Sequence, residues 1–379
     1  MKIAQTFAGL LVLLLSFSSQ VLSQERVLIV VTNNQQVQAT LAGKDTLAAG
    51  GYELSEVSEA YNVFIESGLE VDFLSPRGGM TYYEPEEEMN EVNKAFIAKK
   101  EVMRQLENSL SPSDVDAKDY VAIYFAGGKT MWDFPESKEL GQLAASIYEA
   151  EGVVGAVCHG PAALVNAKLS DGSYLVAGRK ISSFTDMEEK LFSKAAKFLP
   201  FFLQEKLTSL GANFQEMPPL FNQSVVDGRL VTGQNPLSTY SVANELVKLM
   251  GKEGVERTWT DLSYTMEVIK LVVLADESEA KRFMKAHAET NQLKEKLVQD
   301  YSSYAFAGHL GEYAKSNGLK LLEFSAEIFP ASAKSQEALA QAYHSLGKEE
   351  LALNFLNKSL AIEPNSPSAL KLKEEMRVN

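Results

Sequence analysis

The residues with the clearest chemical potential are the single cysteine of this 379-residue chain, Cys158, and the histidine that follows it, His159. A thiolate is a strong nucleophile, and an adjacent imidazole can take its proton. The apolar run of Val153 to Val157 comes directly before the cysteine, and Pro161 follows it closely. This order predicts a buried strand that ends at the thiol and a helix that begins near the proline. The dipole of that helix is expected to lower the pKa of the thiol.

The neighbours of Cys158 favour a reactive role over a structural one. Ala156 and Gly160 stand two residues before and after the thiol, so small side chains flank it on both sides. This spacing is typical of a nucleophile elbow, a tight strand-to-helix turn that presents one side chain above a sheet. The alternative is a buried structural cysteine, which is the commonest fate of an isolated thiol. The coincidence of strand end, small neighbours, histidine and helix start favours the nucleophile.

Two other segments could serve the same chemistry. The glycines of Phe125-Ala126-Gly127-Gly128 follow a buried strand, and their N–H groups are candidates for an oxyanion hole. A glycine pair on its own is more often only a turn. Glu56 stands near the start of a predicted helix, and its spacing alone favours a solvated carboxylate.

Strand-like and helix-like patterns alternate between residues 27 and 250, which predicts an α/β fold with a mostly parallel sheet covered on both faces. The expected strands cover 27–31, 69–74, 120–125, 153–157, 175–176, 180–183 and a hairpin at 225–231 with an Asp-Gly turn. The expected helices cover 54–67, 84–110, 136–149, 187–210 with a break at Pro200, and 237–250. The glycine loop then lies at the carboxyl end of a strand, where sites form in such sheets.

The pattern becomes helical after Gly251 to Gly254, which marks a domain boundary. Residues 333–366 have the length and pattern of a tetratricopeptide repeat, and a shift of 34 residues places Leu322 under Leu356. We therefore expect a second, all-α tetratricopeptide-like domain that docks peptides. The alternative is a helical tail that only packs on the first domain. We expect the chain to divide into a leading segment (1–23), the α/β domain (24–252), a linker and helical segment (253–298) and the repeats (299–379).

Charge and composition exclude several classes of function. The chain has 36 Lys and Arg against 50 Asp and Glu, and its net charge of −14 argues against nucleic acid as a partner. One cysteine excludes an intramolecular disulfide, and four histidines argue against a His-rich metal centre. Neither a dinucleotide fingerprint nor a phosphate-binding loop is present, so we expect no cofactor and no metal.

The first residues have the pattern of a secretory signal peptide. Lys2 precedes the apolar run of Ala8 to Phe17, and small and polar residues lead to a cleavage point between Ser23 and Gln24. The run is short for a membrane span, although an uncleaved anchor is the alternative. We therefore expect an exported protein in a periplasmic or extracellular location.

Five motifs in chain order carry a family resemblance: GYELSE, DYVAIYFAGG, AVCHGPAAL, ISSFTDMEE and DGRLVTGQNP. Together they resemble the ThiJ/PfpI superfamily over about residues 26–250. The resemblance implies the flavodoxin-like, doubly wound fold of class I glutamine amidotransferase-like domains. The most similar branch holds heat-shock chaperones and the cofactor-independent glyoxalases, or glyoxalase III.

The resemblance also implies roles for individual residues. Cys158 matches the nucleophile and His159 the histidine beside it, while Glu56 matches a buried acid that contacts the thiol. Glu189 matches the acid that orients the histidine, with Glu188 as the near alternative. Gly128 matches the backbone oxyanion donor.

One departure from the family pattern affects the substrate pocket. The family loop commonly reads Gly-Gly-His-Gly-Thr before Met-Trp-Asp, whereas this chain reads Gly127-Gly128-Lys129-Thr130 before the same tripeptide. The loop is thus one residue shorter and lacks the histidine, which puts the pocket and the oxyanion geometry in doubt.

The resemblance implies a small reactive aldehyde such as methylglyoxal as the substrate. Cys158 would form a hemithioacetal, Glu56 or His159 would move a proton between adjacent carbons, and water would release a hydroxy acid such as lactate. One alternative is an amidase or peptidase that uses the same thiol for acyl transfer. Another is a non-enzymatic chaperone or redox sensor that works with the helical repeats. The apolar segment Phe198 to Leu203 is compatible with a lid edge, a homodimer contact or core packing.

Overall fold

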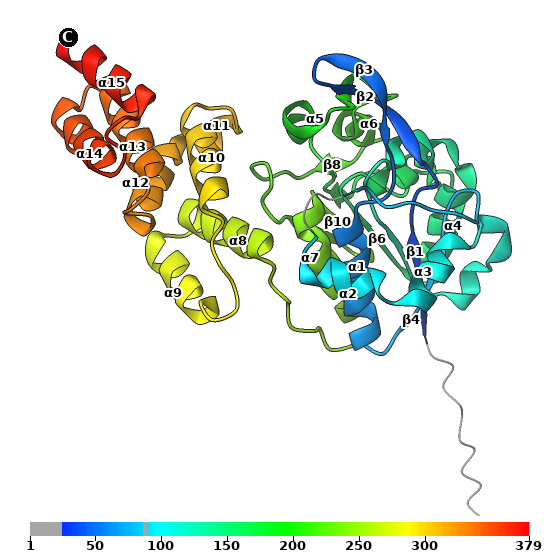
Figure 1. The fold of residues 1–379 in the computed structure, drawn as a ribbon. Coiled ribbons are helices and arrows are strands. Elements are labelled where there is room, and N and C mark those ends of the chain that lie inside the picture. The colour runs from blue at the N-terminus through cyan, green and yellow to red at the C-terminus, as the bar shows by residue number, and fades with distance from the viewer. Residues whose placement is uncertain (1–24, 86–88, 379) are drawn as a thin grey trace, which may run out of the picture.

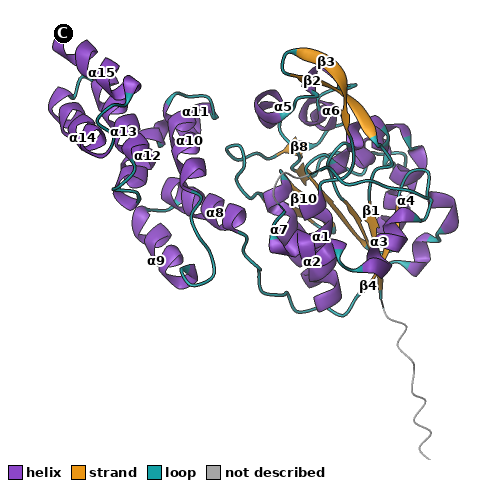
Figure 2. Cartoon of the chain, in the orientation of Figure 1, coloured by secondary structure: helices purple, strands orange, loops and turns teal. Residues whose placement is uncertain are grey.

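The computed structural model describes residues 25–85 and 89–378, which form an α/β part followed by an all-helical part (Figure 1). The strands gather in the first part, whereas the second part is built from helices and turns (Figure 2). The expected signal peptide, residues 1–23, lies outside the described residues. No described helix combines the length and the apolar character that crossing a bilayer requires.

The α/β part is built on a six-stranded sheet with the order β4-β1-β5-β6-β10-β9. Every neighbouring pair is parallel except β9 and β10, which form the expected hairpin with Leu230 opposite Asp227. The predicted α/β class with a mostly parallel sheet is thus confirmed. The strands are β1 (Arg26–Val30), β2 (Gln36–Leu41), β3 (Lys44–Ala49), β4 (Glu70–Leu74), β5 (Ala122–Phe125), β6 (Val153–Val157), β7 (Lys180–Ile181), β8 (Asn213–Phe214), β9 (Ser224–Asp227) and β10 (Leu230–Gly233).

Helices cover both faces of this sheet because its strands are apolar on both faces. In β1, Val27 and Ile29 belong to one core cluster, and Leu28 and Val30 belong to the other. Successive side chains of a strand point to opposite faces, so a continuous apolar run needs two covering layers. The helices of this part are α1 (Leu54–Glu66), α2 (Glu91–Ile97), α3 (Lys100–Glu107), α4 (Lys138–Glu149), α5 (Asp186–Phe192), α6 (Leu203–Ser209) and α7 (Thr239–Leu249).

The all-helical part begins at Asp261 and continues to the end of the described chain. Gly318 allows two of its helices to approach closely, because a Cβ there would lie 2.4 Å from the Cα of Phe306. Leu322 and Leu356, which the 34-residue shift places together, are both buried. The helices are α8 (Asp261–Leu274), α9 (Glu277–His287), α10 (Glu295–Phe306), α11 (Gly311–Ser316), α12 (Gly318–Ile328), α13 (Ala333–Ser345), α14 (Glu349–Ile362) and α15 (Pro367–Val378).

The expected repeat 333–366 contains the helix pair α13 and α14, whereas the preceding 34 residues contain α11 as an additional short helix. The tetratricopeptide assignment and its peptide-docking role remain predictions.

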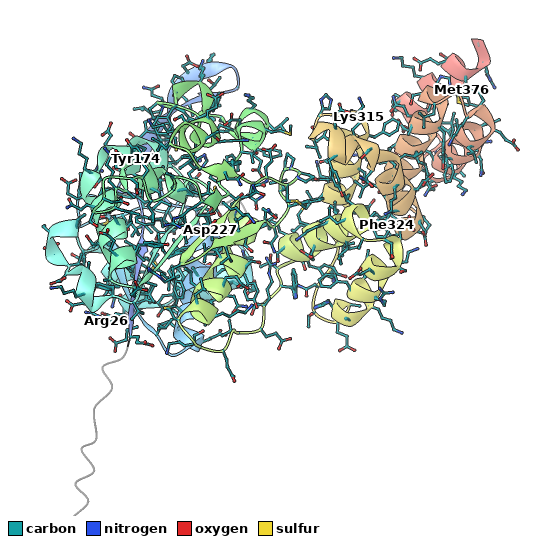
Figure 3. The ribbon with its side chains drawn as sticks, turned by 180° about the vertical axis from the view of Figure 1, so that it is seen from behind. Arg26, Tyr174, Asp227, Lys315, Phe324 and Met376 are labelled. Atoms are coloured by element: carbon teal, nitrogen blue, oxygen red, sulfur yellow. The ribbon has the colours of Figure 1, made fainter. Side chains whose placement is uncertain are left out.

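The loop before β9 provides the surface on which the helical part packs. Phe221, which is fully buried, stacks on Tyr301 of α10 with ring centroids 5.6 Å apart. The Tyr301 hydroxyl donates to the backbone oxygen of Pro219 at 3.2 Å, and Lys270 Nζ of α8 donates to the backbone oxygen of Asn222 at 3.0 Å. The helices therefore pack on the α/β part mainly at residues 217–222, with further contacts from Leu237 and from Met187 of α5. Figure 3 shows the two parts from behind, with side chains in the space between their ribbons.

Four local expectations need correction. Residues 175–176 lie in a turn, and the chain after Cys158 forms a 3-10 helix over Gly160–Asn166 instead of an α-helix. The expected boundary between residues 298 and 299 falls inside α10 (Glu295–Phe306). The β2–β3 hairpin was not expected, because residues 36–49 lack a continuous apolar run and much of the hairpin is exposed.

The β2–β3 hairpin contacts the segment that follows α5 through a hydrogen bond and an ion pair. The Thr40 N–H donates to the backbone oxygen of Lys194 at 2.7 Å, and Lys197 pairs with Asp45. Phe198 to Leu203, which the sequence left open between a lid, a dimer contact and the core, is partly exposed, with Leu199 and Phe201 packed against the core. Its part in a homodimer remains a prediction.

We predict that Phe221→Ala loosens the helical part. The loss of a buried aromatic ring should cost about 3–5 kcal/mol of the free energy of unfolding. Trypsin should also cleave the connecting segment faster at Lys252 and Arg257, because the helical part loses a packing contact with the α/β part. Urea unfolding and a proteolysis time course test both effects.

Phe64→Ala serves as the matched control. Phe64 is equally buried but packs on Tyr124 within the α/β part. It should lower stability without accelerating cleavage of the connecting segment. Equal cleavage rates in Phe221→Ala and the unsubstituted protein would contradict the role of Phe221 in holding the helical part against the α/β part.

Candidate active site

The turn at Cys158 has the strained backbone of a nucleophile elbow. Its φ angle is +57°, a left-handed conformation that non-glycine residues rarely adopt. The Cys158 N–H donates to the backbone oxygen of Gly233 at 3.0 Å, and its carbonyl accepts from the Phe184 N–H at 2.8 Å. A Cβ at Gly160 would lie 2.1 Å from the backbone oxygen of Phe125, so the turn requires glycine there. The small residues expected around the thiol are therefore needed for the turn itself.

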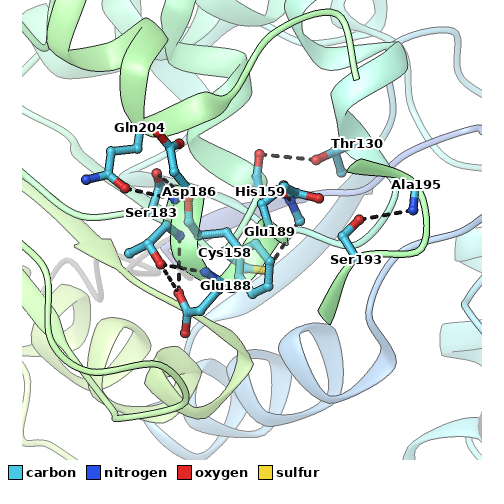
Figure 4. A network of polar contacts seen from close by, with 12 residues as sticks. Thr130, Cys158, His159, Ser183, Asp186, Glu188, Glu189, Ser193, Ala195 and Gln204 are labelled. Carbon is cyan, nitrogen blue, oxygen red and sulfur yellow. Dashed lines mark hydrogen bonds and ion pairs between the residues drawn. The ribbon is translucent and has the colours of Figure 1, made fainter. Parts of the chain in front are cut away.

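A chain of polar contacts leads from the thiol to α5 (Figure 4). Cys158 Sγ lies 3.5 Å from His159 Nδ1, and His159 Nε2 lies 2.7 Å from Glu189 Oε2. The Glu189 carboxylate accepts a hydrogen bond from the Nε2–H of His159. The lone pair of Nδ1 therefore faces the thiol. The arrangement can therefore draw a proton from sulfur onto the imidazole.

Charge favours this direction of proton transfer. Burial raises the pKa of Glu189, but attraction to His159 and the hydrogen bond between them outweigh burial and hold the pKa below its usual value. An ionised Glu189 stabilises the imidazolium that forms when His159 takes a proton.

Glu188 and Glu189 have different structural roles. Glu188 Oε1 accepts from the N–H of Leu220 and from Asn235 Nδ2, both at 2.9 Å. Its Oε2 accepts from both the N–H and the hydroxyl of Thr185, which caps the start of α5. Glu188 thus fixes the position of α5, and the adjacent Glu189 faces His159.

Glu56 lies fully buried beside the thiol, not in solvent as its spacing alone suggested. The N–H of Gly127 donates to its Oε2, and a Cβ at Gly127 would lie 2.9 Å from both that oxygen and the Cys158 Cβ. Burial, followed by repulsion from Glu53, raises the pKa of the Glu56 carboxyl well above its usual value. Burial therefore favours the protonated form of Glu56, which can give a proton within the site.

The expected lowering of the thiol pKa is wrong. Burial raises the pKa of Cys158 well above its usual value, and the nearby Glu56 carboxyl raises it further. The 3-10 helix after the thiol is only seven residues long, so its dipole does not offset the loss of solvation. The thiol is protonated at rest, and His159 must take its proton before attack.

Gly128 has the position and the backbone expected of an oxyanion donor. Its φ angle is +87°, and a Cβ there would lie 2.5 Å from the Glu53 nitrogen. Within residues 25–85 and 89–378, neither the Gly128 N–H nor the His159 N–H has a protein acceptor. The His159 N–H is therefore a second candidate donor that reasoning from side-chain types did not identify, although elbow geometry places such a donor directly after the nucleophile.

The thiol opens into a cavity of about 420 Å³. Unexpected walls come from the β2–β3 hairpin, which contributes Val37, Ala39 and Ala48. Phe184 lies against the His159 ring with centroids 4.7 Å apart. The hairpin thus contributes apolar walls to a cavity that also contains the polar groups of the site.

Several aromatic residues close to the site in sequence have packing roles. Tyr83 packs on Tyr52, Phe134 packs on Phe125, and Trp132 lies against the core. No three side chains of the His, Cys, Asp and Glu types within the described ranges are grouped as metal ligands.

We predict that Glu189→Gln slows alkylation of Cys158 by iodoacetamide. Loss of about 1.4 kcal/mol of support for the imidazolium would reduce the rate about tenfold. The matched control is Glu205→Gln, an exposed carboxylate on the neighbouring helix α6, which should leave the alkylation rate near that of the unsubstituted protein. A rate unchanged by Glu189→Gln would refute the assigned direction of proton transfer.

We also predict that Glu56→Gln stabilises the fold, increasingly so as pH rises. Because burial raises the pKa of Glu56, the folded state binds the proton more tightly than the unfolded state. Glu56 therefore lowers stability progressively as pH rises from about 4.5, the usual pKa, toward the higher folded-state value. The amide should abolish this loss, so the Tm advantage of Glu56→Gln should be small near pH 4.5 and larger at pH 8.

Glu66→Gln is the control for this series, because Glu66 is exposed at the end of the same helix. It should leave Tm nearly unchanged throughout. A Tm advantage of Glu56→Gln that does not vary with pH would contradict the neutral state of Glu56.

Comparison with known proteins supports the same assignment of fold. A model of the DJ-1/PfpI family matches residues 46–249, more than half of the chain. The Rapid Encystment Protein 24 KDa of Francisella tularensis is 30% identical, with a TM-score of 0.55 over 60% of this chain and 99% of that protein. Glyoxalase III of Candida albicans is 29% identical, with a TM-score of 0.54 over 59% of this chain and 97% of that structure.

Curated relatives carry names of the same kind. Glutathione-independent glyoxalase HSP31 of Saccharomyces cerevisiae is 34% identical over 212 residues, which cover 52% of this chain and 87% of the yeast protein. A probable glutathione-independent glyoxalase of Schizosaccharomyces pombe, hsp3103, is 39% identical over 155 residues, which cover 39% of this chain and 59% of that protein. The chain belongs to the DJ-1/PfpI family, and its relatives include proteins named glyoxalases.

Proposed function

We propose that this protein converts a small 2-oxoaldehyde such as methylglyoxal to a hydroxy acid without a cofactor. The observation that carries the proposal is the position of a neutral, buried carboxylic acid, Glu56, beside a thiol that has its own base in His159. The names of the relatives support the same reaction class. If residues 1–23 act as the expected signal peptide, the substrate is met outside the cytosol.

The first step is formation of a hemithioacetal. His159 Nδ1 takes the thiol proton, and the sulfur pair attacks the aldehyde carbon. The carbonyl pair moves to oxygen, where the N–H groups of Gly128 and His159 stabilise the charge. Glu56 then gives its proton to this oxygen and becomes a carboxylate.

The carboxylate of Glu56 acts next as a base. It removes the hydrogen from the former aldehyde carbon, the freed pair forms a carbon–carbon double bond, and the neighbouring carbonyl becomes an oxyanion. Glu56 returns the proton to the second carbon. The hydroxyl proton on the first carbon passes to the second oxygen by way of His159, which leaves a thioester of the hydroxy acid.

Water completes the reaction. The Glu56 carboxylate takes a proton from the water as the water attacks the thioester carbonyl, which restores the carboxylic acid. The sulfur leaves and regains a proton from His159, and the hydroxy acid dissociates. The first carbon is oxidised and the second is reduced, so no external oxidant is needed.

The same thiol, imidazole and carboxylate would also suit acyl transfer to water. The N–H groups of Gly128 and His159, which have no acceptor among the described residues, favour this second candidate equally. The requirement for Glu56 separates the two reactions, because acyl transfer needs no second acid to exchange protons with carbon.

We predict that the protein lacking residues 1–23 forms lactate from methylglyoxal. Cys158→Ala should abolish the product, and Glu56→Gln should lower kcat by about 10²-fold or more, because it removes the acid and base of the isomerisation. Hydrolysis of p-nitrophenyl acetate by the same variants is the parallel assay. Lactate formation that survives Glu56→Gln, or ester hydrolysis without any lactate, would exclude the proposed reaction and favour the acyl-transfer enzyme.

A further inference from the structure

The loop after β5 places a positively charged side chain, Lys129, at the wall of the cavity. Lys129 follows Gly128, and its Nζ lies 2.6 Å from Glu84 Oε2. Both side chains line the cavity with Cys158 and His159, and they are only 30% and 22% exposed. The backbone beneath is fixed, because the Lys129 N–H donates to Gly51 at 2.8 Å and its carbonyl accepts from Asn34 Nδ2 at 2.9 Å. This is where the chain departs from the family loop.

The Lys129 ammonium keeps its charge in this setting. Burial lowers the pKa of the lysine, but Glu84 outweighs burial, so the pKa lies above its usual value. The ammonium also attracts the carboxylate of Glu189, and it attracts the sulfur of Cys158 once the thiol has lost its proton. A partly buried ion pair contributes little to stability compared with apolar packing. A purely structural role therefore explains the pair poorly.

The proposed reaction has a need that the backbone donors do not meet. Its intermediate carries oxygens on two adjacent carbons. The first oxygen forms on the carbon bound to sulfur, within reach of the N–H groups of Gly128 and His159. The second oxygen gains negative charge when Glu56 removes the hydrogen of the first carbon, and it requires a donor of its own.

We propose that Lys129 binds the second oxygen of a 1,2-dicarbonyl substrate and stabilises the enediolate on that side. The inference rests on the proposed function and deepens it, because it gives the pocket a preference for 1,2-dicarbonyl compounds over simple aldehydes. In the isomerisation, the carbon–hydrogen pair forms the new double bond and the second carbonyl pair moves to oxygen. The ammonium of Lys129 stabilises the negative charge on this oxygen, and no bond of the lysine forms or breaks.

The test compares Lys129→Met with Lys194→Met. Lys194 lines the same cavity but is exposed at its rim, so its change removes the same charge from a different place. Lys129→Met should lower kcat for methylglyoxal about 10²-fold, the usual effect of losing one oxyanion donor. KM should change much less, Lys129→Arg should restore part of the rate, and Lys194→Met should retain most of it.

Two further measurements separate this role from a structural one. Because Lys129 also attracts the thiolate, Lys129→Met should slow the alkylation of Cys158 by iodoacetamide, but far less than it lowers kcat. Propanal, which has one carbonyl, should protect Cys158 from alkylation equally well in Lys129→Met and in the unsubstituted protein. Because Lys129→Met leaves Glu84 without its cation, the double variant Lys129→Met/Glu84→Gln should fold as stably as the unsubstituted protein and show the same loss of kcat.

A Lys129→Met enzyme with kcat near that of the unsubstituted protein overturns the inference. So does an equal loss in Lys194→Met, or a parallel fall in the alkylation rate, which would assign Lys129 to the thiol instead of the substrate. An unsubstituted protein that makes no hydroxy acid refutes the proposed function itself and the role of Lys129 with it.

Discussion

The left-handed backbone at Cys158 is the constraint on which the rest of the site depends. A sharp turn at the end of β6 places the thiol beside Glu56 and His159, and its hydrogen bonds to the Gly233 carbonyl and the Phe184 N–H hold it there. The same turn brings Gly160 so close to the end of β5 that this position has no room for a side chain. The parallel sheet supplies the rigid base, since β5, β6 and β10 are joined along their lengths. Strain at one residue is thus supported by the most deeply buried part of the molecule.

The electrostatics of the site follow from burial more than from any helix. Burial raises the pKa values of Cys158 and Glu56, so both hold protons at rest, while His159 keeps the neighbouring Glu189 ionised. The site therefore stores protons that can be passed on when a substrate arrives. The fold bears a cost for this arrangement, because neutral pH favours ionised carboxylic acids and the folded state opposes ionisation of Glu56.

Much of this organisation could be predicted from the sequence because it depends on local pattern. The apolar strands, the Asp-Gly hairpin and the small residues around Cys158 each have a signal within a few positions. The Glu189 contact with His159 needed the family motif, because 30 residues separate the two partners. The β2–β3 hairpin, the Lys129–Glu84 pair and the raised thiol pKa had no such signal. They depend on which distant segments exclude water from the site, and that is a property of the assembled fold.

The segment that seats the helices also supports the site. Leu220 donates to Glu188, its neighbour Phe221 stacks on Tyr301 of the helical part, and Glu188 is next in sequence to Glu189. Truncation after α7 would uncover the ring of Phe221 and release the loop that holds Glu188. The family domain in this chain is therefore not an interchangeable module. One short segment contacts both the helical part and Glu188, so the helices support a site that they do not line.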